Sequence, residues 1–410
     1  INGTVLETTY VHDPFNRRTS EIDVNGVETI TAYDALNRID LVTQKGATSG
    51  DDIVKEYAYN GFGDLDLVTL PEGNLIDYAF SDTNGDLAKG RLTAIEKKPN
   101  ASMPGERIAY VYDNLGKKSR EEMQSWNGTG WVAESWRDYE YYGRCQLKKV
   151  IDASGNAQEM NYDCSGNVDK LWDAAHPSSS QTAIPSTTYT YDALNRISTV
   201  SQPWAGAGGG FAVTTYGYDI QDHLTSVLDA VGGSTTYVYS DRDLMTQQFS
   251  EVSGTTTYSY NARGSLATEL DARGVTISRN YDAMNRPATV GALPAIDYAS
   301  ASLDVNYVWG SNAGAFEKGR LKTISTTSTS IAYEYDRFGR MTQDGSLGYS
   351  FDKNDNATQI TYPGGVLATY TFDFADRQAS LSVTKGGYPP EVVVSSAAYR
   401  PFGPLSSFGF

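Results

Sequence analysis

The sequence is poor in the residues that usually carry catalysis. It has two cysteines and three histidines in 410 residues, and no hydrolase, phosphate-loop or dinucleotide motif surrounds them. The many carboxylates single out no acid/base pair, because the distance between two acids cannot be inferred from a turn-rich sequence. We therefore expect a protein that is not an enzyme and needs no cofactor, in which His12, His176 and His223 are turn residues.

Two acidic segments, residues 82–86 and 352–356, resemble the opening of a calcium loop. In the first, Leu87 and Thr93 stand where such a loop needs glycine and a bidentate glutamate, and the second departs at the same positions. Asp and Asn in this spacing also bond their own backbone in turns. We expect turns, and no metal site, at both places.

Basic residues are also scarce. Lys and Arg number 33 against 50 Asp and Glu, which gives a net charge of −17. A protein that binds nucleic acid needs a basic stripe, so nucleic acid is not an expected partner. No apolar run approaches the roughly 20 residues of a membrane helix, and the opening residues lack both methionine and the basic start of a signal peptide. We expect a fragment of a longer protein, without a membrane span.

Cysteine usage leaves the redox compartment open. Cys145 and Cys164 lie 19 residues apart, close to one repeat of the pattern described below. A disulfide between neighbouring hairpins and two incidental thiols are both compatible with this spacing.

Helix signals are nearly absent, and tyrosine, with 29 copies, dominates the apolar content. Between residues 216 and 287 a Tyr-x-Tyr pair returns without a change of length, its second aromatic at Tyr218, Tyr239, Tyr260 and Tyr281. Two aromatics at i and i+2 lie on one face of a strand. A polar tetrad and a second alternating run follow, so each unit of 21 residues reads as a β-hairpin.

The pattern extends over nearly the whole chain. We predict an all-β protein, a single array of hairpins over residues 1–410, with a regular block at 216–287 and degenerate or insertion-bearing repeats at 1–215 and 288–410. The residues that define the repeat are Tyr33, Asp34, Tyr191, Asp192, Tyr218, Asp219, Tyr239, Tyr260, Tyr281, Asp282, Tyr335 and Asp336.

Tryptophans lie in or beside the longer insertions. Trp126, Trp131 and Trp204 are candidate ligand contacts, because exposed aromatic rings on an acidic sheet can stack on sugars. The alternative is that they cover apolar surface at the ends of the sheet.

The repeat resembles a known family. The segments YDALNRI at 191–197, YDAMNR at 281–286 and YDRFGRM at 335–341 are similar to the YD repeats of the Rhs family, which includes bacterial Rhs toxins, the C components of insecticidal Tc toxins, and teneurins. The resemblance implies a sheet that spirals into a hollow shell, or part of one. The self-cleaving core that follows the repeats in toxin members is missing from this sequence.

The resemblance implies a secreted or cell-surface bacterial shell that is not an enzyme and that encapsulates and sequesters an effector. Its partners would be the enclosed toxin domain or other toxin-complex subunits. The alternative is a cell-surface recognition or adhesion module that binds carbohydrate or a partner protein. The two functions share one scaffold, so the fold does not choose between them.

Overall fold

The computed structural model describes residues 6–81, 89–175, 184–204, 210–293 and 305–409. Within these residues the protein is all-β, as predicted, with two 3₁₀ turns, η1 (Ser49–Asp51) and η2 (Ala313–Ala315). Strands adjacent in sequence pair antiparallel as hairpins, for example β17 (Phe211–Tyr218) with β18 (Leu224–Leu228). No helix in this described part of the chain is long and apolar enough to cross a membrane.

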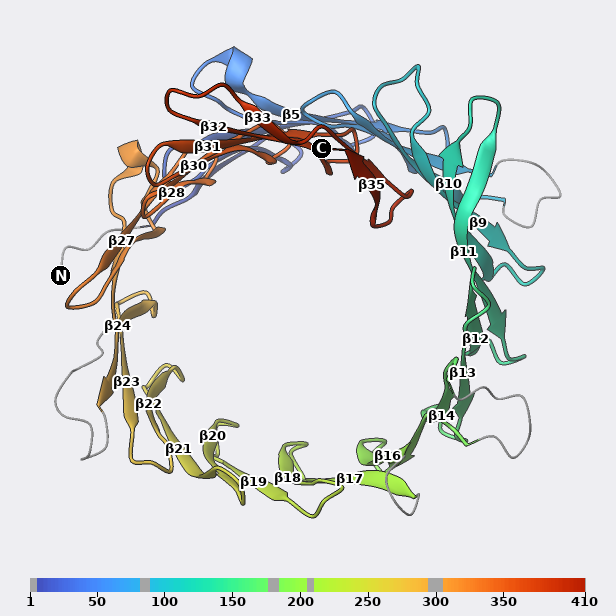
Figure 1. Cartoon of the computed structure of the whole chain (residues 1–410), viewed down its shortest axis with the longest axis vertical. Helices are drawn as coiled ribbons and strands as arrows, with labels where there is room; N and C mark the ends of the chain where they lie inside the picture. The colour runs from blue at the N-terminus through green and yellow to red at the C-terminus, as the bar shows by residue number, and fades with distance from the viewer. Residues whose placement is uncertain (1–5, 82–88, 176–183, 205–209, 294–304, 410) are drawn as a thin grey trace. The chain divides into compact units, whose positions relative to one another are not determined.

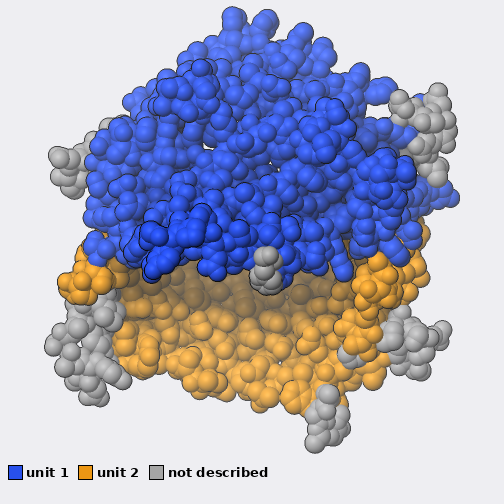
Figure 2. All heavy atoms as spheres, turned by 45° about the horizontal axis from the view of Figure 1, so that its top comes forward, with its two compact units in different colours: residues 1–136, 308–324, 330–410 blue, residues 137–307, 325–329 orange. Residues whose placement is uncertain are grey.

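The chain divides into two compact units, coloured separately in Figure 2. Unit 1 comprises residues 1–136, 308–324 and 330–410, and unit 2 comprises residues 137–307 and 325–329. We call the described residues up to 136 the N-segment of unit 1, and those from 308 onward the C-segment. In Figure 1 the strands of unit 2 follow one another along a curved sheet.

The strands of the N-segment, up to the boundary inside β11, are β1 (Thr9–His12), β2 (Arg18–Ile22), β3 (Glu28–Tyr33), β4 (Ile39–Gln44), β5 (Ile53–Tyr59), β6 (Leu65–Thr69), β7 (Leu75–Phe80), β8 (Leu92–Lys98), β9 (Glu106–Tyr112), β10 (Lys118–Trp126) and β11 (Trp131–Tyr141). Those of unit 2, up to the boundary inside β25, are β12 (Leu147–Asp152), β13 (Ala157–Tyr162), β14 (Val168–Trp172), β15 (Thr187–Tyr191), β16 (Ile197–Pro203), β17, β18, β19 (Ser234–Tyr239), β20 (Met245–Ser250), β21 (Gly254–Tyr260), β22 (Leu266–Leu270), β23 (Thr276–Tyr281), β24 (Pro287–Leu293) and β25 (Val305–Trp309). Those of the C-segment are β26 (Leu321–Ser325), β27 (Ser330–Tyr335), β28 (Met341–Asp344), β29 (Leu347–Phe351), β30 (Ala357–Tyr362), β31 (Val366–Phe372), β32 (Gln378–Lys385), β33 (Glu391–Val394), β34 (Ser396–Tyr399) and β35 (Leu405–Gly409).

The turn after each repeat tyrosine follows from its sequence. In residues 34–38 the backbone N–H of Asp34 donates to the carbonyl of Arg38 at 2.9 Å. Asp34 Oδ1 accepts the N–H groups of Leu36 and Arg38, and its Oδ2 accepts Arg38 Nε at 2.7 Å. Asn37 has φ 65°, the left-handed region that Asn and Gly tolerate best. The register shifts between Ala32 and Tyr33. The Asp-x-x-Asn-Arg motif therefore encodes a tight hairpin turn with a bulge.

Each repeat tyrosine also joins its hairpin to the preceding one. Tyr218 Oη donates to the carbonyl of Ile197, the residue that opens the return strand of the previous repeat, at 3.0 Å. The guanidinium of Arg196, from the previous turn, lies 4.7 Å from the centroid of the Tyr218 ring. The same hydroxyl bond is made by Tyr33, Tyr59, Tyr112, Tyr162, Tyr191, Tyr239, Tyr260, Tyr281, Tyr335 and Tyr399. The repeat tyrosine thus makes a contact between neighbouring repeats, across spans of 14 to 23 residues.

Antiparallel pairing makes the turns alternate between two edges of the sheet. We call the edge that carries the turns after the repeat tyrosines edge A, and the opposite edge, which carries turns such as 23–27 and 70–74, edge B. All the apolar side chains that are buried among the described residues lie in unit 1: Val27, Ile53, Val68, Leu75, Ala94, Ala368, Ala375 and Pro401. Three of these residues, Val27, Leu75 and Ala375, lie in or directly after turns at which the two segments of unit 1 contact each other.

The two cysteines are free thiols in the structure, both exposed. Cys145 occupies the left-handed position of the turn 142–146, with φ 72°, where other repeats have Asn, Asp or Gly. We predict that Cys145→Asn stabilises the fold by about 0.5–1 kcal/mol, because Asn tolerates this backbone conformation at lower cost. Urea unfolding measures the gain. Cys164→Asn, in an edge A turn but outside the left-handed position, is the control, and an equal gain there would contradict the explanation.

Candidate functional site: the seam of unit 1

In unit 1, edge A turns of the C-segment lie on edge B turns of the N-segment. We call this contact the seam. It joins residues 271 to 303 positions apart in the sequence, as in the bonds Arg377 to Glu106 and Lys353 to Gly50. In Figure 1 the blue and orange-red strands lie together at the top of the view. The seam is built by polar side chains that bond backbone groups and side chains of the facing turn.

At one end of the seam Asn25 bonds a single residue of the C-segment twice. Its Oδ1 accepts the N–H of Lys318 at 2.9 Å, and its Nδ2 donates to the carbonyl of Lys318 at 3.2 Å. Asn25 is only 6% exposed. A carboxamide matches the donor and acceptor of a backbone, so the pair satisfies groups that the contact takes out of water.

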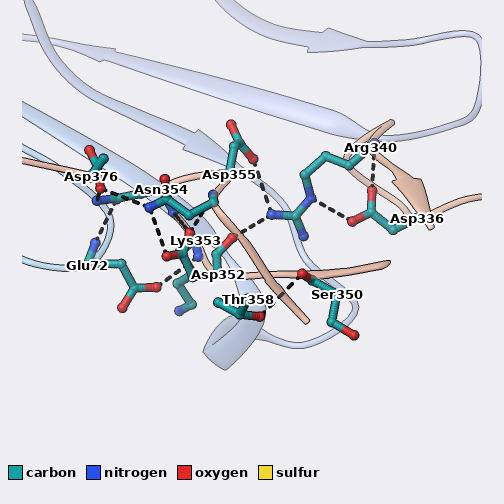
Figure 3. A network of polar contacts seen from close by, with 11 residues as sticks. Glu72, Asp336, Arg340, Ser350, Asp352, Lys353, Asn354, Asp355, Thr358 and Asp376 are labelled. Carbon is teal, nitrogen blue, oxygen red and sulfur yellow. Dashed lines mark hydrogen bonds and ion pairs between the residues drawn. The ribbon is translucent and has the colours of Figure 1, made fainter. Parts of the chain in front are cut away.

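Asn354, in the edge A turn 352–356, is the centre of the next contact (Figure 3). Asn354 Nδ2 donates to Asn74 Oδ1 and to Asp376 Oδ1, both at 2.9 Å. Asn354 Oδ1 accepts the N–H of Glu72 at 3.1 Å, and Glu72 Oε1 accepts the N–H of Lys353 at 2.8 Å. Each turn therefore supplies both backbone and side-chain groups to the other.

The facing turns are held further by bonds to backbone carbonyls. Asn74 Nδ2 donates to the carbonyl of Phe374 at 2.8 Å. Arg337 Nε donates to the carbonyl of Lys45 at 2.7 Å. Beside the contacts of Asn74 and Asn354 lies a hollow of about 380 Å³, and its lining includes Glu72, Asn74, Asp352, Asn354, Tyr370 and Phe372.

A buried carboxylate stabilises the other end of the seam. Glu106 is 5% exposed, and its Oε2 lies 2.7 Å from the Arg377 guanidinium and accepts the N–H of Phe402 at 3.2 Å. Burial by itself would lower the pKa of Arg377, but its hydrogen bond to Asp373 and the charge of Glu106 outweigh burial and raise that pKa. The guanidinium is thus shared by a carboxylate of each segment.

Sequence reasoning did not identify the seam residues. Asn25, Asn74 and Asn354 stand in turns, where Asn is common for local reasons, and Glu106 opens an ordinary strand. Their partners are nearly 300 residues away. The repeat period carries no signal for which turn faces which.

The repeat-defining residues have structural roles: the tyrosines join neighbouring hairpins, and the aspartates bond groups of their own turns. The hydroxyl bonds of the predicted tyrosines are given above, and Asp192, Asp282 and Asp336 each bond the arginine four residues later, as Asp34 does. Asp219 makes the same bond to His223 Nδ1 at 2.8 Å, and the ring of His223 stacks on Tyr239. His223 therefore occupies the arginine position of the repeat.

The structure brings two of the three predicted tryptophans together. The rings of Trp126 and Trp131 meet edge to face at 5.5 Å at the tip of the β10–β11 hairpin, and the Arg107 guanidinium lies 4.5 Å from the centroid of Trp131. Trp204 belongs to unit 2 and is 54% exposed. Their role as ligand contacts stays a prediction.

The segment 352–356 is a turn: Asp352 Oδ1 accepts the N–H groups of Asn354 and Asn356. The other calcium-like segment, 82–86, and His176 lie outside the described residues. His12 is the exposed last residue of β1, so the expectation that it is a turn residue is wrong. In the described part of the chain no cluster of three or more His, Cys, Asp or Glu side chains could hold a metal ion.

The turn aspartates predict a loss of stability in acid. The backbone N–H of Arg38 is the largest cause that lowers the pKa of Asp34 below its ordinary 3.8, and Arg196 does the same for Asp192. A depressed pKa contributes stability that is present above the ordinary value and is lost as the pH falls through the folded-state value. We expect the free energy of unfolding in urea to change little between pH 7 and 5 and to fall below about pH 4.

A double variant, Asp34→Asn with Asp192→Asn, tests this cause. Asn60 and Asn261 already occupy the same turn position and accept the same two backbone N–H groups. The variant is therefore expected to keep the turns and to show a smaller acid loss than the wild type. An equal loss in both proteins would rule out these carboxylates as its source.

Known structures share this architecture. No family model matches the chain, and no curated protein matches it. The crystal structure of TcdB2-TccC3-TEV superposes on 98% of the chain with a TM-score of 0.71 at 14% identity. This chain therefore shares the fold of the matching part of TcdB2-TccC3-TEV. TcdB2-TccC3-Cdc42 gives a TM-score of 0.67 at 14% identity, and the Photorhabdus luminescens Tc holotoxin pore, with the TccC3-D651A mutation, gives 0.62 at 13%. The chain spans 27% of the length of each of these three.

Proposed function

We propose that this chain is shell material of a toxin complex of the Rhs type, a single YD-repeat array that encloses an effector segment and is not itself an enzyme. The observation that carries the proposal is the match of 98% of the chain to TcdB2-TccC3-TEV. The Tyr-Asp turns support it, because the motif that resembles YD repeats is also the motif that builds each hairpin here. A secreted bacterial protein with other toxin-complex subunits as partners belongs to the same proposal.

The seam supports an enclosing role by its chemistry. A single sheet can exclude proteases and targets from one of its faces only if the neighbouring rows of hairpins leave no gap between them. In unit 1 the facing turns are joined by bonds to backbone groups, with Asn25 and Glu106 buried between them. Sequestration would then be steric, and no bond of the effector would be made or broken by this chain.

Protease protection tests the proposal. The natural protein that contains this chain is purified and digested with trypsin, and the fragments are identified by mass spectrometry. We expect a segment outside the array to resist cleavage while the exposed turns are cut, and to become cleavable in the Glu106→Ala variant, which weakens the seam. If every segment outside the array is cut equally fast in both proteins, the chain encloses nothing and should be tested as a binding surface instead.

A further inference from the structure

A row of exposed apolar side chains lies along edge A of the N-segment. Each is the third residue of a turn that follows a repeat tyrosine or its equivalent. Their exposed fractions are 76% for Phe15, 70% for Leu36, 81% for Phe62 and 67% for Leu115. We call these four side chains the edge A row. Large apolar groups exposed in a regular row indicate an interaction surface.

The seam shows what such a row contacts. In the C-segment the third position of the edge A turns holds Phe338, Asn354, Ala375 and Phe402. Ala375 is 7% exposed, the other three are half-buried, and the ring of Phe402 lies beneath Lys97 of the N-segment, with Nζ 5.6 Å from its centroid. The third residue of an edge A turn is therefore at least half-buried where an edge B lies against that turn, and exposed where no edge B does.

An edge B turn of unit 1 is also exposed. Edge B turns of the N-segment contact the C-segment at the seam, but the β32–β33 turn on edge B of the C-segment carries Tyr388, which is 70% exposed. Beside it is a hollow of about 730 Å³, and its lining is Val366, Val383, Lys385, Tyr388, Pro389, Pro390 and Glu391. Most of this lining is apolar or aromatic, with Lys385 and Glu391 as its charged residues, so the aliphatic and aromatic tips of the edge A row would bury apolar surface there.

We propose that the edge A row is a docking surface for a second copy of this chain, which presents edge B of its C-segment. The contact would continue the seam between molecules: edge A of one copy on edge B of the next. Such a contact is heterologous, so each added copy presents a new free edge. The inference concerns self-assembly and does not depend on the enclosure of an effector.

Sedimentation velocity over a concentration series tests the proposal. The wild-type chain of 44.7 kDa is expected to sediment as a growing series of species as its concentration rises. The double variant Leu36→Asp with Phe62→Asp is expected to stay monomeric. The control, Val231→Asp with Val252→Asp, removes two side chains of unit 2 that are 84% and 92% exposed and should associate as the wild type does. Circular dichroism and the urea midpoint verify that each variant is folded.

A mixing experiment tests the direction of the contact. Tyr388→Asp blocks edge B and leaves edge A intact. The double variant Leu36→Asp with Phe62→Asp blocks edge A and leaves edge B intact. Each protein alone is expected to be monomeric, while their mixture forms a dimer of about 89 kDa, twice 44.7 kDa, and nothing larger. A wild-type chain that is monomeric at every concentration, association that survives the edge A substitutions, or a mixture without dimer would each overturn the proposal.

Discussion

Glu106→Ala is expected to destabilise the protein by about 2–4 kcal/mol, because it removes one partner of a buried ion pair. The substitution leaves the Phe402 N–H without its acceptor and the Arg377 guanidinium with Asp373 as its remaining carboxylate. That second carboxylate keeps the expected loss below the upper end of the range for buried pairs. Urea unfolding followed by tryptophan fluorescence measures the loss.

Two variants isolate the cause. Glu106→Gln keeps an oxygen that can accept from Arg377 and Phe402 but removes the charge, so an intermediate loss is expected. Glu140→Ala removes a carboxylate that is 47% exposed and lies 3.6 Å from Lys148, a surface pair worth about 0–1 kcal/mol. If Glu106→Ala costs no more than Glu140→Ala, Glu106 does not hold the seam.

Asn25→Ala is expected to cost about 2–3 kcal/mol, the second largest effect of a single substitution. The change leaves the N–H and the carbonyl of Lys318 without the partners that Asn25 supplies, in a place that water does not reach freely. The measurement is again the free energy of unfolding in urea. It is combined with limited proteolysis, in which faster cutting after Lys318 would report a local opening of the seam.

Arg273→Ala is the matched control for Asn25. Arg273 is the third residue of the turn 271–275 on edge B, as Asn25 is of the turn 23–27, but its side chain is 83% exposed. Its loss is expected to change stability by less than about 0.5 kcal/mol. Equal effects at the two positions would contradict the claim that the facing turn gives Asn25 its importance.

The sequence predicted the repeat because its contacts are local. In the regular block the tyrosine hydroxyl bond spans 15 residues, and the Asp34 turn spans five, so both contacts lie within two neighbouring repeats and recur with each repeat. The prediction of a single array over residues 1–410 stays a prediction, since the structure is described in two units.

The seam could not be predicted in the same way. Asn25 and Ser154 both stand third in an edge B turn, and nothing in the repeat distinguishes the buried one from the exposed one. Which turns meet depends on small increments of twist and curvature summed over many strands, and on insertions that change the number of residues between two edges. The repeat pattern of one sequence does not give the total twist and curvature of the sheet.

Hydrogen–deuterium exchange tests the central claim, that the two segments of unit 1 meet at the seam, most directly. The N–H groups of Glu72, Lys318, Lys353 and Phe402 donate across the seam. We expect these four amides to exchange slowly in the wild-type protein. In the Glu106→Ala variant all four should exchange at least tenfold faster. The amides of Ala35 and Ala193, which occupy the position of Lys353 in uncovered turns, should exchange fast in both proteins. Fast exchange of the seam amides in the wild-type protein, at the rate of Ala35 and Ala193, would contradict the central claim.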